Sequence, residues 1–362
     1  MTHRKIGVEE EFLLIDPDSG RPTPVAESLL HTEAAKEASE VESELHCQQI
    51  ETATPPCATL EELGSELVSA RRRAADATRA AGAELAALGT SPLAVQAEVF
   101  PARRYRKLAR RFGLMTEDQL TCGCHVHVEI TDEAEGVGVL DRIRPWLSVL
   151  LALSANSPYW QDAESGYASY RSQVWSRWPS AGITELFGSP EAYHRTVRAM
   201  LETGTILDEG MVYFDARLSR QFSTVEIRVA DVCLLPGDAA LLGALTRALV
   251  DTAAREWHAG RPAPPIPVAV LRLAAWRAGR HGLTDELVDP ITMSLAPATK
   301  VLDTMLAHLE ESLESYGDLE AVREMLADLI GRGNGAARQQ REYRRTGQLT
   351  DVVKMAVRTT AG

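Results

Sequence analysis

The stretch Lys5-Ile-Gly-Val-Glu-Glu-Glu-Phe-Leu-Leu-Ile15 is apolar apart from three consecutive glutamates at its centre. The turn sequence Asp16-Pro-Asp-Ser-Gly20 follows it, so we predict a β-strand that ends there. Strand side chains alternate between faces, which places Glu9 and Glu11 together and Glu10 on the other side. Two carboxylates on one face repel and raise each other's pKa unless a cation lies between them. Alone, this strand fits a metal site and a solvated sheet edge equally well.

A second alternating stretch, residues 121–130, contains Cys122-Gly-Cys-His-Val-His-Val-Glu129. Alternation puts three polar side chains on one face, namely His125, His127 and Glu129. The two cysteines point the other way, and a tetrahedral zinc site needs four ligands that converge. We therefore expect the thiols to be small core residues and not zinc ligands. The His-x-His-x-Glu face suits a divalent cation or an anionic substrate, and it equally suits a polar face whose groups pair with one another.

A third alternating stretch, Ser223–Cys233, puts Val225, Ile227 and Val229 on its core face. The opposite face carries Thr224, Glu226 and Arg228. These could form a simple ion pair between strands, or a metal-binding carboxylate beside an arginine for phosphate or carboxylate. Three strands that each carry an acidic or histidine-bearing face favour one shared sheet face. Such a face would hold several divalent ions, as a nucleoside triphosphate requires.

The remaining pattern predicts the fold class. Residues 41–54 read as a further strand, and Thr59-Leu-Glu-Glu62 is a capping box that begins a helix predicted to reach Leu88. From about Asp238 the pattern is almost entirely helical. Strands first and helices afterwards indicate an α+β fold with an antiparallel sheet. We expect a single domain over residues 1–362, sheet-rich to 235 and helical from 236.

Composition restricts the partners. The formal charge is −13, which disfavours nucleic acid and anionic membrane surfaces. The longest apolar patch, Trp146–Ala155, is too short to cross a bilayer, and the first residues do not resemble a signal peptide. Five cysteines without an export signal indicate reduced thiols and a cytoplasmic protein. No phosphate-binding Walker loop, nucleophile elbow, dinucleotide fingerprint or His-Glu-x-x-His helix occurs.

Several motifs in fixed order resemble the type 2 glutamate–cysteine ligase family, also called YbdK-like carboxylate–amine ligases, and especially its actinobacterial members. The resemblance covers nearly the whole chain. It is carried by these segments: Gly7-Val-Glu-Glu-Glu11, Glu51-x-x-Thr-Pro55, Cys124-His-Val-His-Val128, Tyr170-Arg-Ser172, Ser176-Arg-Trp-Pro179, Thr224-Val-Glu-Ile-Arg228 and Asn334-Gly-Ala-Ala-Arg-Gln-Gln-Arg341.

The resemblance implies a curved antiparallel sheet of the glutamine synthetase and glutamate–cysteine ligase catalytic type, flanked by helices. ATP and Mg²⁺ or Mn²⁺ would lie on its concave face. The implied metal ligands are Glu9, Glu11, Glu44, Glu51, His127 and Glu226. Seven residues separate Glu44 from Glu51, and in one regular strand an odd separation would put them on opposite faces. A bulge or bend between these two residues is therefore expected.

Other roles follow from the same resemblance. Arg228 is the expected contact to phosphate or to the substrate carboxylate, with Thr224 beside it at the cofactor. Arg171 and Arg177 lie in a segment rich in Tyr and Trp and could close over the cofactor and substrate, or stack on its tryptophans. Glu129 stands where many members have glycine. It could bind the incoming amine, deprotonate it as a catalytic base, hold another cation, or be paired and structural.

The implied activity is that of an ATP-dependent carboxylate–amine ligase. The γ-carboxylate of glutamate would form an acyl phosphate, and an amine would then displace phosphate. Expected partners are therefore a small carboxylate, an amine and a second copy in a homodimer. Three alternatives remain open at this point: a phosphotransferase on the same sheet, a non-catalytic protein that binds nucleotide and metal, and a hydrolase that needs no ATP.

Overall fold

The computed structural model describes residues 3–32, 34–35 and 41–361. Its centre is a seven-stranded sheet with the order β2-β3-β1-β5-β9-β8, and β4 also pairs with β1. All paired neighbours are antiparallel. The predicted α+β fold with an antiparallel sheet is confirmed. The strands of this sheet are β1 (Ile6–Ile15), β2 (Val41–Ser43), β3 (Gln49–Ala53), β4 (Glu84–Ala86), β5 (Gly123–Glu129), β8 (Ala216–Leu218) and β9 (Thr224–Asp231).

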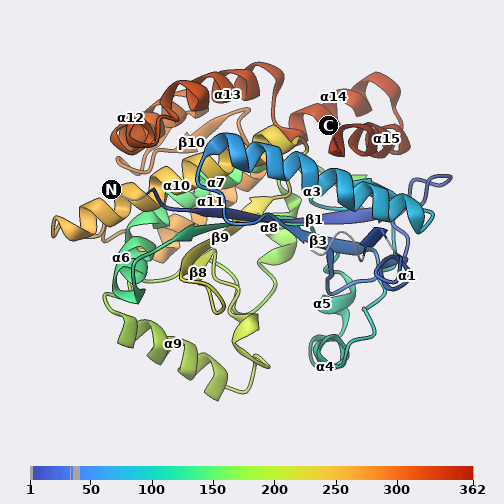
Figure 1. Cartoon of the computed structure of the whole chain (residues 1–362), viewed down its shortest axis with the longest axis horizontal. Helices are drawn as coiled ribbons and strands as arrows, with labels where there is room; N and C mark the ends of the chain where they lie inside the picture. The colour runs from blue at the N-terminus through green and yellow to red at the C-terminus, as the bar shows by residue number, and fades with distance from the viewer. Residues whose placement is uncertain (1–2, 33, 36–40, 362) are drawn as a thin grey trace.

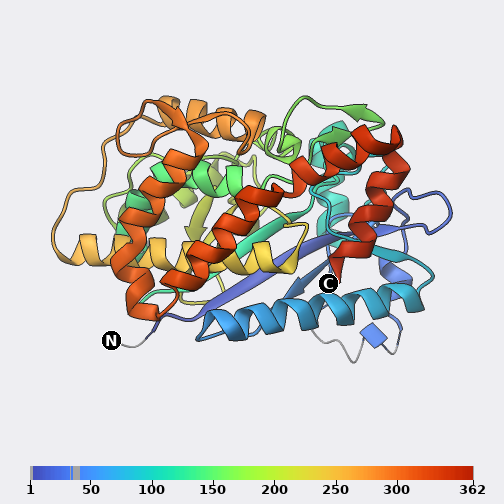
Figure 2. The ribbon, with the colours of Figure 1, turned by 90° about the horizontal axis from the view of Figure 1, so that it is seen from above.

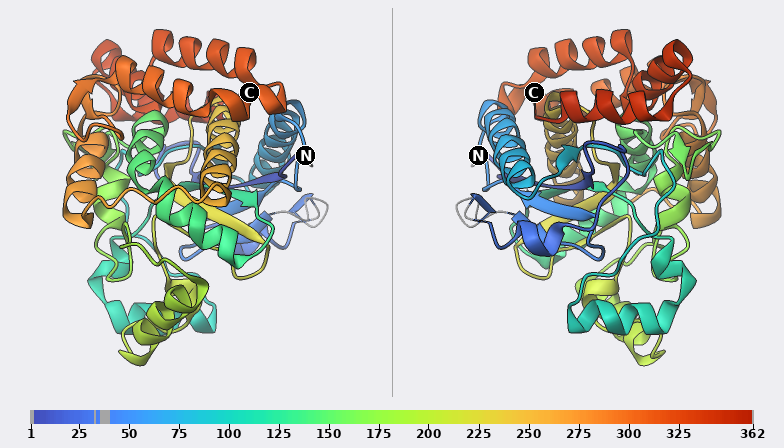
Figure 3. Two further views of the ribbon diagram at one scale, coloured as in Figure 1. Left: turned by 90° about the vertical axis from the view of Figure 1, so that its left-hand side faces the viewer. Right: turned by 90° about the vertical axis from the view of Figure 1, so that its right-hand side faces the viewer.

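Helices cover the two faces unequally. A thick layer lies over the upper face in the view of Figure 1, and Figure 2 shows these helices crossing above the strands. This layer contains α3 (Leu60–Ala80), α10 (Pro236–His258), α12 (Ala298–Tyr316), α13 (Leu319–Arg332), α14 (Gly335–Thr346) and α15 (Leu349–Thr360). Below the sheet hang α4 (Arg103–Phe112), α5 (Leu114–Glu117) and α9 (Pro190–Glu202), as both views of Figure 3 show for α4 and α9. The lower face therefore has only partial helical cover.

The other elements complete the framework. They are α1 (Ala26–Leu29), α6 (Glu133–Ile143), α7 (Leu147–Ser154), α8 (Tyr170–Trp175), α11 (Val268–His281), the 3₁₀ turns Arg144–Trp146 and Glu209–Met211, and the strand pairs β6 (Tyr159–Trp160) with β7 (Ala163–Glu164) and β10 (Glu286–Val288) with β11 (Leu295–Pro297). The helical pattern after Asp238 did not predict the pair β10 and β11. None of the described helices is long and apolar enough to cross a bilayer.

The start of α3 was predicted correctly and its end was not. Thr59 accepts a hydrogen bond from the backbone of Glu62 at 3.1 Å, and the Glu62 carboxylate accepts one from the backbone of Thr59 at 3.3 Å. The helix ends at Ala80 and not at Leu88. Gly82 takes a backbone φ of +79°, which favours glycine, and β4 then pairs with β1. Residues 84–86 therefore form a strand of the sheet, although their sequence pattern predicted a continuing helix.

The single strand predicted for residues 41–54 is wrong, because the segment folds back on itself. Strands β2 and β3 pair as an antiparallel hairpin that sets Glu42 opposite Glu51. Glu44 lies in the connection between them. The chain reversal thus supplies the bend that the odd spacing of Glu44 and Glu51 demanded.

A buried ion pair joins the helical layer to the sheet. The Arg71 guanidinium of α3 contacts the Glu10 carboxylate of β1 at 2.6 and 2.9 Å, and at most 2% of either side chain is exposed. Arg71 also donates hydrogen bonds to three carbonyl oxygens: Cys233 at 2.7 Å, Leu234 at 3.1 Å and Thr360 at 3.1 Å. One side chain therefore connects β1, α3, the end of β9 and α15.

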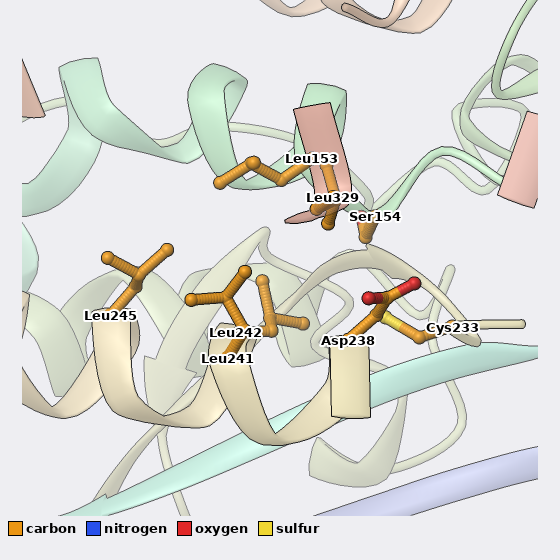
Figure 4. A pocket seen from close by; sticks show the side chains of 8 residues that line it. All are labelled: Leu153, Ser154, Cys233, Asp238, Leu241, Leu242, Leu245 and Leu329. Atoms are coloured by element: carbon orange, nitrogen blue, oxygen red, sulfur yellow. The ribbon is translucent and has the colours of Figure 1, made fainter. Parts of the chain in front are cut away.

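The helical layer itself leaves little space. A gap of about 10 Å³ lies between α7, α10 and α13. Figure 4 shows the side chains that line it, mainly leucines with Ser154, Cys233 and Asp238. Such a volume admits roughly one water molecule.

We expect Arg71→Ala to lower the free energy of unfolding by about 3–5 kcal/mol, because it leaves the Glu10 carboxylate buried without a counter-charge. The double variant Glu10→Leu/Arg71→Met removes both charges and should be closer to wild type. Urea denaturation of the three proteins measures the difference. A loss below about 1 kcal/mol in Arg71→Ala would contradict the role given to this pair.

Candidate active site

A cavity of about 980 Å³ lies against the lower face of the sheet. Its ceiling is formed by β1, β3, β5, β9 and β8, and its far wall by α4 and the segment 208–213. Strand alternation aims the polar side chains of several strands into this one space. The polar sheet face predicted from three separate sequence stretches is therefore continuous.

Cross-strand pairing orders these side chains in three rows. The first row is Glu42, Glu51 and Glu11; the second is Glu9 and His125; the third is His127, Glu226 and Arg217. Directly opposite residues of an antiparallel pair have Cβ atoms about 4.5–5.5 Å apart, so their functional groups can share one ligand.

Three groups of side chains could each hold a cation. In each group, one ligand atom per residue lies within 4.8 Å of the others. The groups are Glu9, Glu51 and His125; Glu9, His127 and Glu226; and Glu11, Glu44 and Glu51. All six residues that the family resemblance implied as ligands lie in these groups. His125 joins them although it was expected only as part of the polar face.

The all-carboxylate group is electrostatically costly on its own. Burial raises the pKa of Glu11, Glu44 and Glu51, and neighbouring carboxylates raise those of Glu44 and Glu51 further. The shift is largest at Glu51, which faces the other carboxylates. A divalent cation would relieve this repulsion, and carboxylate oxygens are the ligands that Mg²⁺ and Mn²⁺ prefer.

The two histidines have the form that cation binding needs. The Nε2 atom of His125 is buried and has no hydrogen-bond partner among the described residues, while the Nε2 atom of His127 lies 3.2 Å from a carboxylate oxygen of Glu9. Burial and the nearby Arg228 lower the pKa of His125 to about 4, so its ring is neutral at pH 7. His127 Nδ1 lies 2.9 Å from Thr224 Oγ1, which orients the ring. Burial would raise the pKa of Glu9, but hydrogen bonds with both histidines lower it below its usual range.

Two arginines hold the third-row carboxylate. Arg217 donates to Glu226 at 2.6 and 3.1 Å, and Arg228 donates to the same carboxylate. Burial raises the pKa of Glu226, but Arg228 and Arg217 outweigh it and bring the value to about 2. The register of β5 on β9 shifts by one residue between Cys124 and Val126, and Arg228 Nη1 lies 3.5 Å from His125 Nδ1. Both guanidiniums thus lie beside the candidate cation groups, where a phosphate would be held.

The structure does not place Arg171 and Arg177 in the cavity wall. Only 1% of Arg171 is exposed; it lies 3.9 Å from Asp231 and packs on Trp175. A Cβ at Gly123 would be 2.3 Å from its Nη2 atom, so β5 needs glycine there to accommodate this arginine. Arg177 lies 3.8 Å from Asp118. Both side chains thus pack or pair outside the cavity lining, and their contact with the cofactor stays a prediction.

The remaining expected residues lie at the rim. Glu129 ends β5, is exposed, and accepts a hydrogen bond from the Lys5 backbone at 3.2 Å. Thr224 lines the cavity beside His127. Sequence reasoning missed Arg217, which lies in a three-residue strand too short to show alternation. It also missed the far wall, formed in part by Arg104, Tyr105, Trp175, Asp208 and Tyr213.

Comparison with known proteins agrees with this geometry. The model of Glutamate-cysteine ligase family 2 (GCS2) matches residues 5–355. A Streptomyces avermitilis protein provisionally named glutamate–cysteine ligase 2-1 is 52% identical over 361 residues, covering 99% of this chain and 100% of its own. A Streptomyces coelicolor protein provisionally named glutamate–cysteine ligase 2 is 52% identical over 359 residues, with 99% of each chain covered.

Solved structures share the fold at low identity. The crystal structure of a Francisella tularensis glutamate–cysteine ligase in complex with AMP has a TM-score of 0.69 and 13% identity. The match covers 99% of this chain and 89% of the other. At that identity the likeness concerns the arrangement of strands and helices.

We expect the melting temperature without divalent cations to fall as the pH rises from 5 to 8, and to fall less in Glu51→Gln. The folded state raises the pKa of Glu51 above 4.5, so it binds a proton that the unfolded chain has released. Stability is therefore lost as pH rises from the unfolded pKa through the folded one, by about 1.4 kcal/mol for each pH unit between the two values. Thermal unfolding with a chelator measures this, with the exposed Glu164→Gln as control. Equal slopes in all three proteins would contradict the repulsive cluster.

Proposed function

Since the chain belongs to glutamate–cysteine ligase family 2, a family of ATP-dependent carboxylate–amine ligases, we propose that it joins the γ-carboxylate of glutamate to an amine. The observation that carries this proposal is the convergence of three candidate cation groups and two arginines on one face of a 980 Å³ cavity. A ligase of this kind must hold a triphosphate and a carboxylate anion together. An acidic sheet face can do so only where cations invert its charge.

The donor set fits divalent metal ions. Five carboxylates and two imidazoles face the cavity, and the Nε2 atom of His125 lacks a hydrogen-bond partner in the described part of the chain. Glu9 and Glu51 each belong to two of the three groups, so neighbouring ions would share them. Bound Mg²⁺ or Mn²⁺ would neutralise phosphate oxygens and align the γ-phosphate with the attacking carboxylate.

The reaction has two steps. A carboxylate oxygen of the donor attacks the γ-phosphorus of ATP; the bond to the bridging oxygen breaks, and ADP leaves. The nitrogen of the amine then attacks the acyl carbon, the carbon–oxygen bond to phosphate breaks, and an amide and inorganic phosphate form. In both steps negative charge moves onto phosphate oxygens.

The protein's own contribution to these steps is positional and electrostatic. Arg217 and Arg228 are fixed in place by Glu226 and present positive charge beside the cation groups. Thr224 fixes the ring of His127. Glu129 lines the cavity at its exposed rim, and we assign to it the proton that the ammonium of the acceptor must lose. No protein nucleophile is required.

We expect the purified protein to release phosphate from ATP only when Mg²⁺ or Mn²⁺, glutamate and a suitable amine are all present. Glu9→Gln should lower kcat by at least roughly 100-fold, because groups that merely support metal ligands already contribute 10- to 100-fold. Glu164→Gln, a carboxylate exposed on β7, is the matched control. A phosphate-release assay over a panel of amines that includes cysteine identifies the acceptor.

Other outcomes separate the alternatives. ADP formed together with a stable phosphorylated product, without free phosphate, would identify a phosphotransferase. ATP binding without turnover under any pairing of substrates would identify a binding protein. Either result would refute the ligase assignment for the substrates tested.

A further inference from the structure

An ion pair on the far wall of the cavity faces the sheet. Arg104 Nε donates to Asp208 Oδ2 and Arg104 Nη2 donates to Asp208 Oδ1, both at 3.0 Å. Both residues line the cavity, and 40% of each side chain is exposed. The pair therefore offers one positive and one negative group, side by side, to a ligand in the cavity.

Holding two segments together does not by itself explain this pair. Arg111 of the same helix already donates to the carbonyl oxygens of Gly204 and Thr205, which fastens α4 to the segment that contains Asp208. An ion pair exposed to this degree adds only about 0–1 kcal/mol. The pair is thus a weak structural contact in a position where a ligand can reach it.

Two tyrosines of the cavity lining accompany the pair. Tyr105 and Tyr213 lie beside Arg104, and the charge of Glu44 acts on both phenols. The charge of Glu51 also acts on the phenol of Tyr105. Both rings line the same cavity as the ion pair and as Glu44 and Glu51 of the all-carboxylate cation group. Their apolar faces suit a short methylene chain that links one polar end to another.

The wall is also kept free of obstruction. A Cβ at Gly210 would lie 2.9 Å from Asp208 Oδ1 and 3.0 Å from Arg104 Nη2. Any larger residue at 210 would push against the pair. Glycine at this position lets the backbone pass behind Arg104 and Asp208 while both charges remain open to the cavity.

We propose that Arg104 and Asp208 bind the α-carboxylate and the α-ammonium of the donor amino acid, and so restrict the donor to free α-amino acids. Arg104 would pair with the α-carboxylate and Asp208 with the α-ammonium, while the γ-carboxylate reaches the cation groups under the sheet. This inference rests on the proposed ligase function and names what selects its carboxylate substrate.

The donor fits this site better than the acceptor. An acceptor amine must lose a proton before it can attack the acyl carbon, and Arg104 lowers the pKa of Asp208, which makes this carboxylate a poor acceptor for that proton. The α-ammonium of the donor takes no part in the reaction. It can remain charged against Asp208 throughout both steps.

Three donors that differ by one group test the assignment. Glutamate carries both α-groups, glutarate lacks the ammonium, and 4-aminobutyrate lacks the α-carboxylate; all three keep the carboxylate that reacts. We expect wild type to use glutamate at least 10-fold better, by kcat/KM, than either analogue. A charged hydrogen bond of about 1.5–3 kcal/mol corresponds to roughly 10- to 150-fold.

Matched variants remove the protein's side of each contact. Asp208→Asn should lower kcat/KM for glutamate roughly 10- to 100-fold and leave glutarate almost unchanged. Arg104→Gln should do the same for glutamate while leaving 4-aminobutyrate almost unchanged. The loss should appear mainly in the KM for glutamate, with the KM for ATP unaltered. Melting temperatures confirm that each variant is folded.

The charge swap Arg104→Asp/Asp208→Arg distinguishes recognition from a structural clamp. It restores the ion pair but moves each charge to the other's position, so we expect glutamate to remain a poor donor. Full recovery of glutamate activity in the swap, or equal losses on all three donors in the single variants, would overturn the proposal. So would a wild type that uses either analogue as well as glutamate, a result that needs no variant to fold. Absence of phosphate release with any donor in wild type would instead refute the ligase function itself.

Discussion

Strand β1 buries carboxylates on both of its faces, and much of the structure follows from how each face is neutralised. On the upper face, the guanidinium of Arg71 compensates Glu10 permanently and is itself held by three backbone carbonyls. On the lower face, no single guanidinium among the described residues compensates both Glu9 and Glu11 in the way that Arg71 compensates Glu10. A buried carboxylate needs a counter-charge or a proton. The carboxylate on one side of the strand is thus neutralised by an arginine of the protein, and those on the other side require cations from solution.

This division explains why the active face can remain both acidic and ordered. The ion pair with Arg71 fixes the position of β1 under α3, and β1 pairs with β3, β4 and β5. The candidate ligands are therefore held by a rigid sheet. Side chains on strands are positioned more accurately than side chains on loops. Substrate selection is assigned instead to the far wall, built from α4 and an irregular segment, where residues can change without disturbing the sheet.

The sheet face could be predicted from the sequence because alternation is a local property. The strands β1, β5 and β9 each show it over seven or more residues, and the faces assigned to Glu9, His127 and Glu226 agree with the structure. Glu44 could be included only through the family resemblance, since its position depends on a hairpin. The sequence could not decide the position of Arg171, because an arginine in an aromatic segment can either contact a cofactor or stack on tryptophans. Arg104 and Asp208 are 104 residues apart and meet only in the folded chain, so no pattern in the sequence predicts their pairing.

The hydrogen bonds of Arg71 also constrain the order in which the protein can form during synthesis. They connect residue 10 to residue 360, so the set is incomplete until the ribosome has produced almost all of the described chain. The amide of Ala87 likewise waits for the hydroxyl of Thr360, to which it donates at 2.8 Å. Glu10 gains its counter-charge once Arg71 has been made, whereas the hydrogen bonds of Arg71 to the carbonyl oxygens of Cys233, Leu234 and Thr360 wait for those later residues. Docking of α15 is therefore the step that completes the hydrogen bonds of the Arg71 guanidinium and of the Ala87 amide.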